Sequence, residues 1–559
     1  MAISNDNTDP EWYYDLGQFH LQITTSSPES QLWFDRGLIW CYGFNHEEAA
    51  KCFQRAIATD ENCAMAYWGL AYALGPNYNK PWKLFGVKER NDTVERTHKA
   101  IAKAQELSGR GTEVEKALIE ALAHRYPGEK PTKTNCSLWN RNYADQMAPA
   151  FEKFPDDPDV ATLYADAMMN LTPWQLWDMG SGEPASGART LEIERILVHA
   201  LSLDSGFKHA GLLHMYIHLM EMSKTPEKAM PAADRLRGLI PDSGHLNHMP
   251  SHLDILCGKY ADAVIANSNA VDADEVFLAR EGPMNFYTLY RCHDYHFRLY
   301  AAMFSGQSQI AFDTVTRLEA TISEDILRIE SPPMADWLES FLAMRLHAYI
   351  RFGKWRDIVQ LPLPQDPELY CVTTALTRYA RGMAFANLQQ VEEAERERCL
   401  FREAVPRVVP TRTLFNNKAV DILGVAGTLL DGELEYRRGN FEIAFAHLRE
   451  SIDRYDSLPF DEPWGWMQPT RHAYGALLLE QGHTEDALAV YAADLGLSQV
   501  LPRTHRHPNN VWALHGYHEC LMKLGRFDEA GEMKPRLEAA LAVADVPIRS
   551  SCFCRRSKM

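Results

Sequence analysis

Residues 32–75 read LWFDRGLIWCYGFNHEEAAKCFQRAIATDENCAMAYWGLAYALG and are the clearest guide to the fold. Gly37 and Gly69 each lie inside a helix-like apolar pattern. Between them, Ala49, Phe53 and Ala56 recur at spacings of four and three residues, which places them on one face of a helix. Small residues at fixed points let two helices approach closely, while aromatic side chains fill the space beside them. The stretch therefore predicts a helix–turn–helix unit.

Weaker copies of this unit, which resembles the tetratricopeptide repeat, follow along the chain. In each copy a glycine and a polar residue, usually with an aromatic residue next, precede an amphipathic segment. The copies are Gly258-Lys259-Tyr260, Gly353-Lys354-Trp355, Gly439-Asn440-Phe441, Gly525-Arg526-Phe527 and, without the aromatic residue, Gly482-His483-Thr484. Glycine suits the left-handed cap that ends a first helix before the second begins. Because alternating strand patterns are nearly absent, we expect an all-α fold, a tetratricopeptide-like helical repeat array (an α-solenoid) that can curl around a central pocket.

The sequence divides into segments of different character. These are an N-terminal segment (1–25), N-terminal repeats (26–125), a helical segment with long loops (126–189), a histidine-rich helical core (190–310), C-terminal repeats (311–545) and a tail (546–559). Breaks in the helical periodicity predict irregular stretches at 126–140, 178–189, 362–367, 456–464 and 502–510. The first two are long for connections between packed helices, and such loops often serve function.

Composition and charge restrict the classes of function. The 559 residues are 46% hydrophobic and 24% charged, which is a globular composition, and the chain is too long for one core. The formal net charge of -18 argues against nucleic acid and against an anionic membrane surface as partners. The sequence contains no apolar run of about 20 residues that could span a bilayer.

The cysteines and the two ends of the chain indicate a compartment. The 11 cysteines are scattered, and the polar N-terminus lacks the pattern of a secretory signal, so we expect an intracellular protein with reduced thiols. We interpret the Cys552–Cys554 pair as incidental. The final Ser557-Lys558-Met559 resembles a peroxisomal address, and a frayed basic end is the alternative. The expected location is therefore cytoplasmic or peroxisomal.

A first histidine motif lies in the stretch from His209 to Glu221. His214, His218 and Glu221 fall on one helix face, and two imidazoles at i and i+4 can bind one metal ion. The spacing is that of the HExxH zinc helix, but Met215 occupies the position of the inner glutamate. The motif therefore predicts metal ligands without the zinc-protease chemistry.

Two further histidine pairs follow within about 85 residues. Pro250 suits the first turn of a helix, so His248 would precede that helix and His252 would lie inside it. His293 and His296 share a helix face at i and i+3. Adjacent antiparallel helices would bring the three pairs around one pocket. We expect a shared metal site there, and hydrogen-bonded structural histidines are the alternative.

The donor types indicate the metal and the roles of the side chains. Several imidazoles with one carboxylate suit copper, iron, zinc or nickel rather than magnesium or calcium. The expected ligands are His214, His218, His248, His252 and His296, and the expected catalytic residues are Glu221 and His293. So many ligands could hold two metals, or some could act as acid–base groups. His209 and His245 would at most support the ligands.

Other candidates in the sequence have simpler interpretations. The sequence contains no phosphate-binding loop, dinucleotide fingerprint or GxSxG nucleophile motif. We interpret residues 75–79 as a helix-ending loop and Asn45 as a helix cap followed by acidic residues. Trp174 and Trp177 are expected to be core or loop anchors rather than part of a substrate cage.

Several segments together resemble one group of proteins. They are Gly43-Phe44-Asn45-His46-Glu47-Glu48-Ala49, Cys63-Ala64-Met65-Ala66-Tyr67-Trp68-Gly69, Gly75-Pro76-Asn77-Tyr78-Asn79, His214-Met215-Tyr216-Ile217-His218, His248-Met249-Pro250-Ser251-His252 and His293-Asp294-Tyr295-His296. They resemble a bacterial and fungal family of tetratricopeptide-repeat proteins, strongly over residues 15–310 and more weakly beyond. The resemblance implies the helical fold but supplies no reaction. Such proteins usually have asparagine at the position of Asp294, so this chain has an extra acid near the expected site.

Two classes of function follow from these patterns. In the first, the chain is a metal-dependent enzyme that acts on a small organic molecule, with oxygen-using redox chemistry preferred and zinc-dependent hydrolysis second. In the second, it is an adaptor whose concave face binds a peptide or protein partner. We favour the enzyme, because an adaptor groove has no need for three paired histidine motifs. The sequence predicts neither the substrate nor the oligomeric state.

Overall fold

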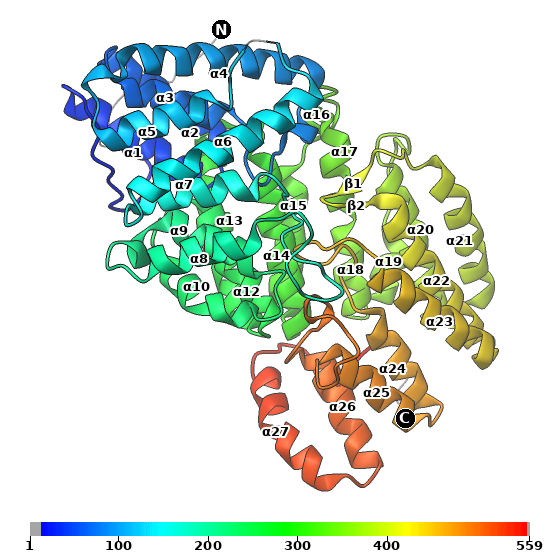
Figure 1. Ribbon diagram of the computed structural model, residues 1–559. Helices are drawn as coiled ribbons and strands as arrows, with labels where there is room; N and C mark the ends of the chain where they lie inside the picture. The colour runs from blue at the N-terminus through cyan, green and yellow to red at the C-terminus, as the bar shows by residue number, and fades with distance from the viewer. Residues whose placement is uncertain (1–12, 129, 556–559) are drawn as a thin grey trace.

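The computed structural model describes residues 13–128 and 130–555. Stacked helices make up most of this part, in an array that runs from the N-terminal helices through the middle of the chain to the C-terminal ones (Figure 1). One small antiparallel sheet occurs in the described residues, where β1 (Thr413–Leu414) pairs with β2 (Asn417–Lys418). None of the helices in these ranges is long and apolar enough to cross a bilayer. The predicted all-α class is confirmed.

The helices follow one another as packed neighbours. The N-terminal helices are α1 (Pro28–Tyr42), α2 (His46–Thr59), α3 (Ala64–Leu74), α4 (Val87–Leu107), α5 (Glu113–Ala123), α6 (Lys133–Lys153), α7 (Pro158–Met169) and α8 (Thr190–Leu201). The central helices are α9 (Ala210–Met220), α10 (Met230–Leu236), α11 (Gly244–His248), α12 (Pro250–Leu256), α13 (Tyr260–Glu281), α14 (Thr288–Ser305) and α15 (Ser308–Thr321). The C-terminal helices are α16 (Glu324–Leu327), α17 (Met334–Leu338), α18 (Met344–Arg351), α19 (Trp355–Gln360), α20 (Cys371–Asn387), α21 (Val391–Ala404), α22 (Ala419–Arg437), α23 (Phe441–Asp456), α24 (Thr470–Glu480), α25 (Thr484–Asp494), α26 (Val511–Lys523) and α27 (Phe527–Leu541). Because most consecutive helices pack in pairs, the chain has the predicted tetratricopeptide-like α-solenoid fold.

The first repeat is held together by one aromatic ring between two glycines. Phe53 of α2 packs against Gly37 of α1 and Gly69 of α3. A Cβ atom built on Gly37 would lie 2.8 Å from the Phe53 ring, and one on Gly69 would lie 2.2 Å from it. Glycine at these two positions is therefore a requirement of the close helix contact, as the sequence pattern predicted.

The glycine turns between paired helices also match the prediction. Gly258, Gly353, Gly439, Gly482 and Gly525 have φ between +65° and +86°, the left-handed region in which glycine pays little steric cost. The following helices α13, α19, α23, α25 and α27 begin two residues after the glycine in each case. The sequence signal thus located the ends of five helices.

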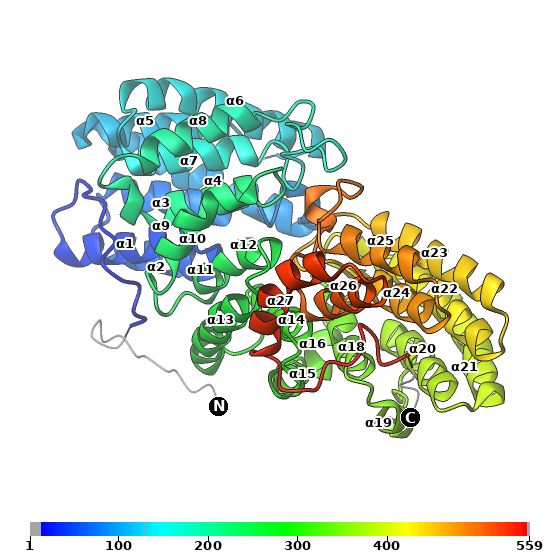
Figure 2. The ribbon, with the colours of Figure 1, turned by 90° about the horizontal axis from the view of Figure 1, so that it is seen from below.

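The array curls back so that its C-terminal helices touch its middle. Trp512 Nε1 of α26 donates to the carbonyl oxygen of Met303 in α14 at 2.7 Å. The Asp545 carboxylate accepts from the backbone N–H groups of Ser308 and Gln309 at 2.7 and 2.8 Å. Figure 2 shows α26 near α14, which it contacts. This closure brings the loop between α23 and α24 to the histidine-rich centre.

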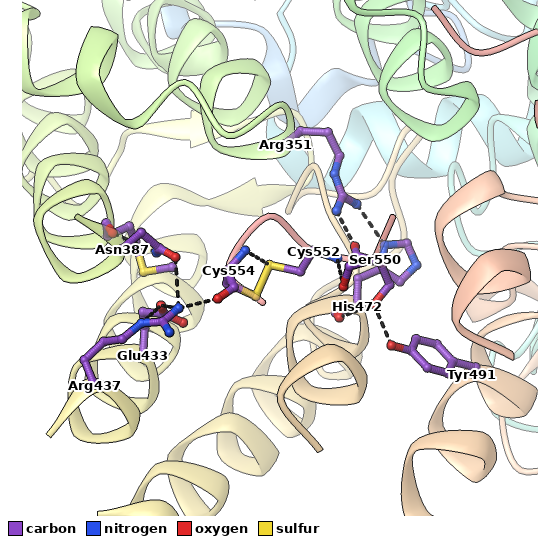
Figure 3. The surroundings of a disulfide bond; sticks show 11 residues. Arg351, Asn387, Glu433, Arg437, His472, Tyr491, Ser550, Cys552 and Cys554 are labelled. Atoms are coloured by element: carbon purple, nitrogen blue, oxygen red, sulfur yellow. Dashed lines mark hydrogen bonds and ion pairs between the residues drawn. A yellow bond between two sulfur atoms is a disulfide. The ribbon is translucent and has the colours of Figure 1, made fainter. Parts of the chain in front are cut away.

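Two expectations about local structure are wrong. Residues 126–140 were expected to be irregular, but α6 begins at Lys133, with the Thr132 side chain accepting from Asn135 N as its cap. Cys552 and Cys554 were expected to be incidental thiols, but the structure joins them in a disulfide, with their Cα atoms 5.1 Å apart (Figure 3). Nine other cysteines in the described residues are free.

The tail beside this disulfide is packed rather than frayed up to Arg555. Ser551 Oγ donates to the carbonyl oxygen of His472 at 2.7 Å, and Arg437 donates to the Cys554 carbonyl oxygen (Figure 3). Arg555 forms an ion pair with Glu519 at 2.6 Å. The expected peroxisomal address, Ser557-Lys558-Met559, lies outside the described residues.

Candidate metal centre

Six histidines converge where the central helices meet the first repeat. They come from α9 (His214 and His218), α11 (His245 and His248), α12 (His252) and α14 (His293). Their ring nitrogens meet in two groups of three, and within each group the ligand atoms lie within 4.8 Å of one another. We call them set A (His214, His218, His245) and set B (His248, His252, His293). Glu221 at the end of α9 forms a third group with His218 and His252 and so joins the two sets.

In set B two ring nitrogens face each other. His248 Nδ1 lies 2.6 Å from Asn267 Oδ1, and His252 Nδ1 lies 2.7 Å from Glu221 Oε2 and 2.9 Å from Glu462 Oε2. Because an Nδ1 atom beside an oxygen acceptor carries the proton, both Nε2 atoms are the ones left to accept. These Nε2 atoms lie 2.7 Å apart. Two lone pairs at this distance need a proton or a metal ion between them.

In set A, two of the three rings have outer partners. His214 Nδ1 donates to the Tyr42 carbonyl oxygen at 2.6 Å, and His218 Nδ1 donates to Glu221 Oε1 at 3.0 Å. His214 Nε2 faces His245 Nε2 at 3.2 Å. His218 Nε2 is buried and has no hydrogen-bond partner among the described residues. Outer groups of this kind orient metal-binding imidazoles in proteins.

Burial and neighbouring carboxylates shift the pKa values of these side chains. Burial lowers the pKa of His214 to about 3 and lowers the pKa values of His218, His245, His248 and His293 well below their usual range, so these rings are neutral. Burial also opposes a charge on His252, but the carboxylates of Glu462 and Glu221 raise its pKa to about 10. A doubly protonated His252 can donate from Nε2 to His248 Nε2, so a proton or a metal ion can bridge the two rings.

Glu221 lies behind the imidazoles rather than in front of them. Its side chain is fully buried, and each of its oxygens accepts from an Nδ1 atom, one in each set. Burial, together with the nearby Glu462 carboxylate, raises the pKa of Glu221 well above its usual range. The predicted catalytic role does not fit this position, because both oxygens are occupied. Glu221 instead orients one ligand of each set.

Each set packs beneath its own phenylalanine. In set A, the Phe44 ring lies 4.5 Å from the His214 ring and stacks on the His245 ring at 5.3 Å. In set B, the Phe297 ring stacks on the His252 ring at 5.3 Å and lies 4.9 Å from the His248 ring. These contacts exclude water from one side of the imidazoles.

Strained backbone surrounds the site. Phe44, Trp174 and Phe415 have φ values of 56°, 63° and 48°, which bulky residues rarely adopt. The Phe415 ring lies 4.7 Å from that of His293, and the Trp174 ring lies 6.0 Å from that of His218. Strain of this kind tends to persist at functional sites, where the surrounding structure enforces it.

A cavity of about 350 Å³ opens in front of both sets. Its histidine lining comes from set A (His245) and set B (His252 and His293). The remaining lining residues are Asn79, Pro81, Lys83, Leu84, Trp174, Phe286, Leu289, Tyr290, Trp337, Thr413, Phe415, Asn416 and Asp461. A larger hollow of about 980 Å³ adjoins the cavity and shares Phe286, Tyr290 and Trp337 with it. A small molecule can therefore reach the rings of His245, His252 and His293.

The structure differs from the sequence-based site at several positions. His296 belongs to neither set, and its ring lies 5.4 Å from that of Phe341. His245, expected to support the ligands at most, is a member of set A. Trp174, expected to be an anchor, lines the cavity, whereas Trp177 donates to the Leu219 carbonyl oxygen as an anchor does. His209 caps α9 and contacts Asp159 at 3.0 Å.

Three partners of the site were not predicted from the sequence. Asn267 and Glu462 hold set B, and the Tyr42 carbonyl oxygen holds His214. Glu462 lies in a stretch that the sequence marked as irregular, and this was the one signal that pointed to it. Asp294, expected as an extra acid near the site, lies 3.3 Å from His248 Nδ1.

Comparisons with known proteins give no functional assignment. No protein-family model matches the chain, and no curated protein does. Among solved structures, the chain is similar to Naa15/Naa10 bound to HypK-THB, with 13% identity, 92% of this chain and 70% of that chain covered, and a TM-score of 0.22. It is similar to yeast Tom70 at 10% identity, with 92% of this chain and 96% of Tom70 covered and a TM-score of 0.30. It is also similar to the human IFIT1 dimer with m7Gppp-AAAA, at 10% identity, with 92% and 97% covered and a TM-score of 0.34.

Proposed function

We propose that the chain is a metal-dependent enzyme that acts on a small organic molecule in the histidine-lined cavity. The observation that carries this proposal is the 2.7 Å approach of His248 Nε2 and His252 Nε2, whose Nδ1 atoms are both held by oxygen acceptors. A metal ion bound there would satisfy both lone pairs and compete with the shared proton. His293, the third member of set B, borders the cavity and so places the bound ion in reach of a substrate.

The donors indicate which metals the site would take. Imidazole nitrogens suit zinc, copper, iron and nickel, whereas magnesium and calcium prefer oxygen. We infer copper, iron or zinc, in line with the sequence-based expectation. The motifs also lead us to place the chain in the bacterial and fungal group of repeat proteins that it resembles.

The cavity wall indicates the substrate class. Trp174, Phe286, Tyr290, Trp337 and Phe415 contribute aromatic rings to it. Rings of this kind favour a flat or apolar organic molecule, while Asn79, Thr413 and Asn416 can orient its polar groups.

Redox chemistry with dioxygen is our first choice of reaction, and zinc-dependent hydrolysis is the second. Hydrolysis by a metal-bound water commonly uses a free carboxylate as a base. Among the described residues that line the cavity, Asp461 is the one carboxyl group, and it accepts from Asn417 Nδ2 at 2.9 Å. The carboxylates of Glu221 and Glu462 face His252. The site therefore offers ligands for a redox metal more readily than a base for water.

Metal analysis of untagged protein tests the proposal. We expect at least one copper, iron or zinc ion per chain, and loss of the set-B ion in His252→Asn. This variant keeps a donor to Glu221 and Glu462 and removes the Nε2 ligand. The matched control is His472→Gln, which changes a buried histidine that contacts Asp494 at 2.9 Å and belongs to neither set. Wild-type protein without a bound transition metal, with both variants only melting earlier, would refute the enzyme and favour the adaptor.

A further inference from the structure

The two histidine sets are too widely spread to share one metal ion. A metal–nitrogen bond is about 2.0–2.1 Å long, so all nitrogens around a single ion lie within about 4.2 Å of one another. In the described residues, the candidate ligand atoms meet within 4.8 Å in groups of three and not in a group of six. One ion can therefore not engage all six histidines at once.

Each set is a complete site in its own right. Set A has its outer partners in Tyr42 and Glu221, and set B has its own in Asn267, Glu221 and Glu462. In each set two Nε2 atoms face each other, at 3.2 Å in set A and 2.7 Å in set B. Each set also has one phenylalanine packed over its rings. Set A thus resembles set B, except that Nδ1 of its facing ring His245 has no hydrogen-bond partner among the described residues.

The two sets are also adjacent and open onto the same space. The ring centroids of His218 and His252 lie 5.6 Å apart, and those of His245 and His248 lie 5.8 Å apart. Glu221 accepts from both sets through its two oxygens. His245 of set A and His293 of set B line one cavity. A molecule bound there would face both sets at once.

From this geometry we propose that set A and set B each bind one transition-metal ion and together form a dinuclear centre facing the aromatic cavity. The inference rests on the proposed function and deepens it, because it assigns His214, His218 and His245 to a second ion. Two adjacent ions can act on one substrate from neighbouring positions, which is the general advantage of two-metal sites.

Copper titration of the full-length protein tests the inference. Metal-free protein is loaded with Cu(II), loosely held copper is removed with a weak chelator, and the copper content is measured. We expect two ions per chain in wild type. We expect one in His218→Asn and one in His252→Asn, because asparagine can keep the hydrogen bond of Nδ1 while the Nε2 ligand is lost. His245→Gln and His293→Gln provide a second variant of each set, and His472→Gln should retain two ions.

Electron paramagnetic resonance of the loaded protein shows whether the two ions interact. Adjacent Cu(II) ions should give less signal than two isolated spins, and each single-set variant should recover the full signal of one spin. One ion in wild type would overturn the dinuclear centre and leave the proposed function intact, whereas none would overturn both. Two ions that persist in His218→Asn and His245→Gln, or two full spins in wild type, would also overturn the inference.

Discussion

Exchange of Glu221 for glutamine tests how the outer carboxylate controls both histidine sets. Glu221 accepts from His218 Nδ1 at 3.0 Å and from His252 Nδ1 at 2.7 Å. Glutamine has one acceptor oxygen, so its amide N–H2 group must face one of the two Nδ1 atoms. That histidine can relieve the contact between two donors by moving its proton to Nε2, which removes it as a metal ligand.

The structure indicates which of the two histidines ceases to be a metal ligand in Glu221→Gln. His252 Nδ1 keeps a second acceptor in Glu462 at 2.9 Å, whereas no other acceptor for His218 Nδ1 occurs among its hydrogen bonds to the described residues. Set A should therefore weaken most in Glu221→Gln. Affinity at set A should accordingly fall roughly 10- to 100-fold, in line with the usual effect of outer partners.

Glu462→Gln is the matched comparison. Glu462 contacts His252, which keeps its bond to Glu221, so we expect less than about a tenfold loss at set B and no change at set A. Chelator-competition titrations of both variants measure the two affinities, and circular dichroism checks the fold. Equal affinities in wild type and Glu221→Gln, or a greater loss at set B than at set A in that variant, would refute the reasoning.

Three further outcomes follow from the structure. Gly69→Ala should destabilise the protein by about 1–3 kcal/mol in urea unfolding, because the new Cβ lies 2.2 Å from Phe53 and this clash outweighs the better helix propensity of alanine. Adding Phe53→Leu to this variant should recover most of the loss, and an unchanged unfolding midpoint in Gly69→Ala alone would contradict the packing. Burial raises the pKa of Asp166 from 3.8 to about 6, so the folded protein keeps this proton to higher pH than the unfolded chain and loses stability as the pH rises through this window. Relative to Asp166→Asn, the free energy of unfolding of wild type should fall by about 3 kcal/mol between about pH 4 and pH 7, and a pH-independent difference would contradict this expectation. His296→Leu should leave the copper content unchanged, since His296 belongs to neither set, and a lost ion would place it among the ligands after all.

Local patterns were sufficient for the repeat architecture. The spacing of Ala49, Phe53 and Ala56 and the glycine turns act within one helix or between two consecutive ones, so they can be recognised in a short stretch of sequence. The same holds for the pair His214–His218, because an interval of four residues keeps two side chains on one helix face. These features follow from helix geometry alone.

Helix geometry does not say which faces meet. His293 and His296 share a face by spacing, yet packing turns His293 to the cavity and His296 to Phe341. His245 stands outside the HMPSH motif, and it joins set A because its Nε2 atom lies 3.2 Å from His214 Nε2.

Glu462 is a partner of the site because the C-terminal part of the array folds back onto its middle. It lies more than 200 residues from His252 in the chain, and it reaches Nδ1 because the array curls and brings the loop after α23 to the centre. The sequence by itself thus determined the helices, their pairing and the pair His214–His218, since each depends on neighbours in the chain. Tertiary packing alone decided that the ligands divide into two sets, that Glu221 lies behind both, and that an aromatic cavity lies in front, because these depend on contacts between distant segments.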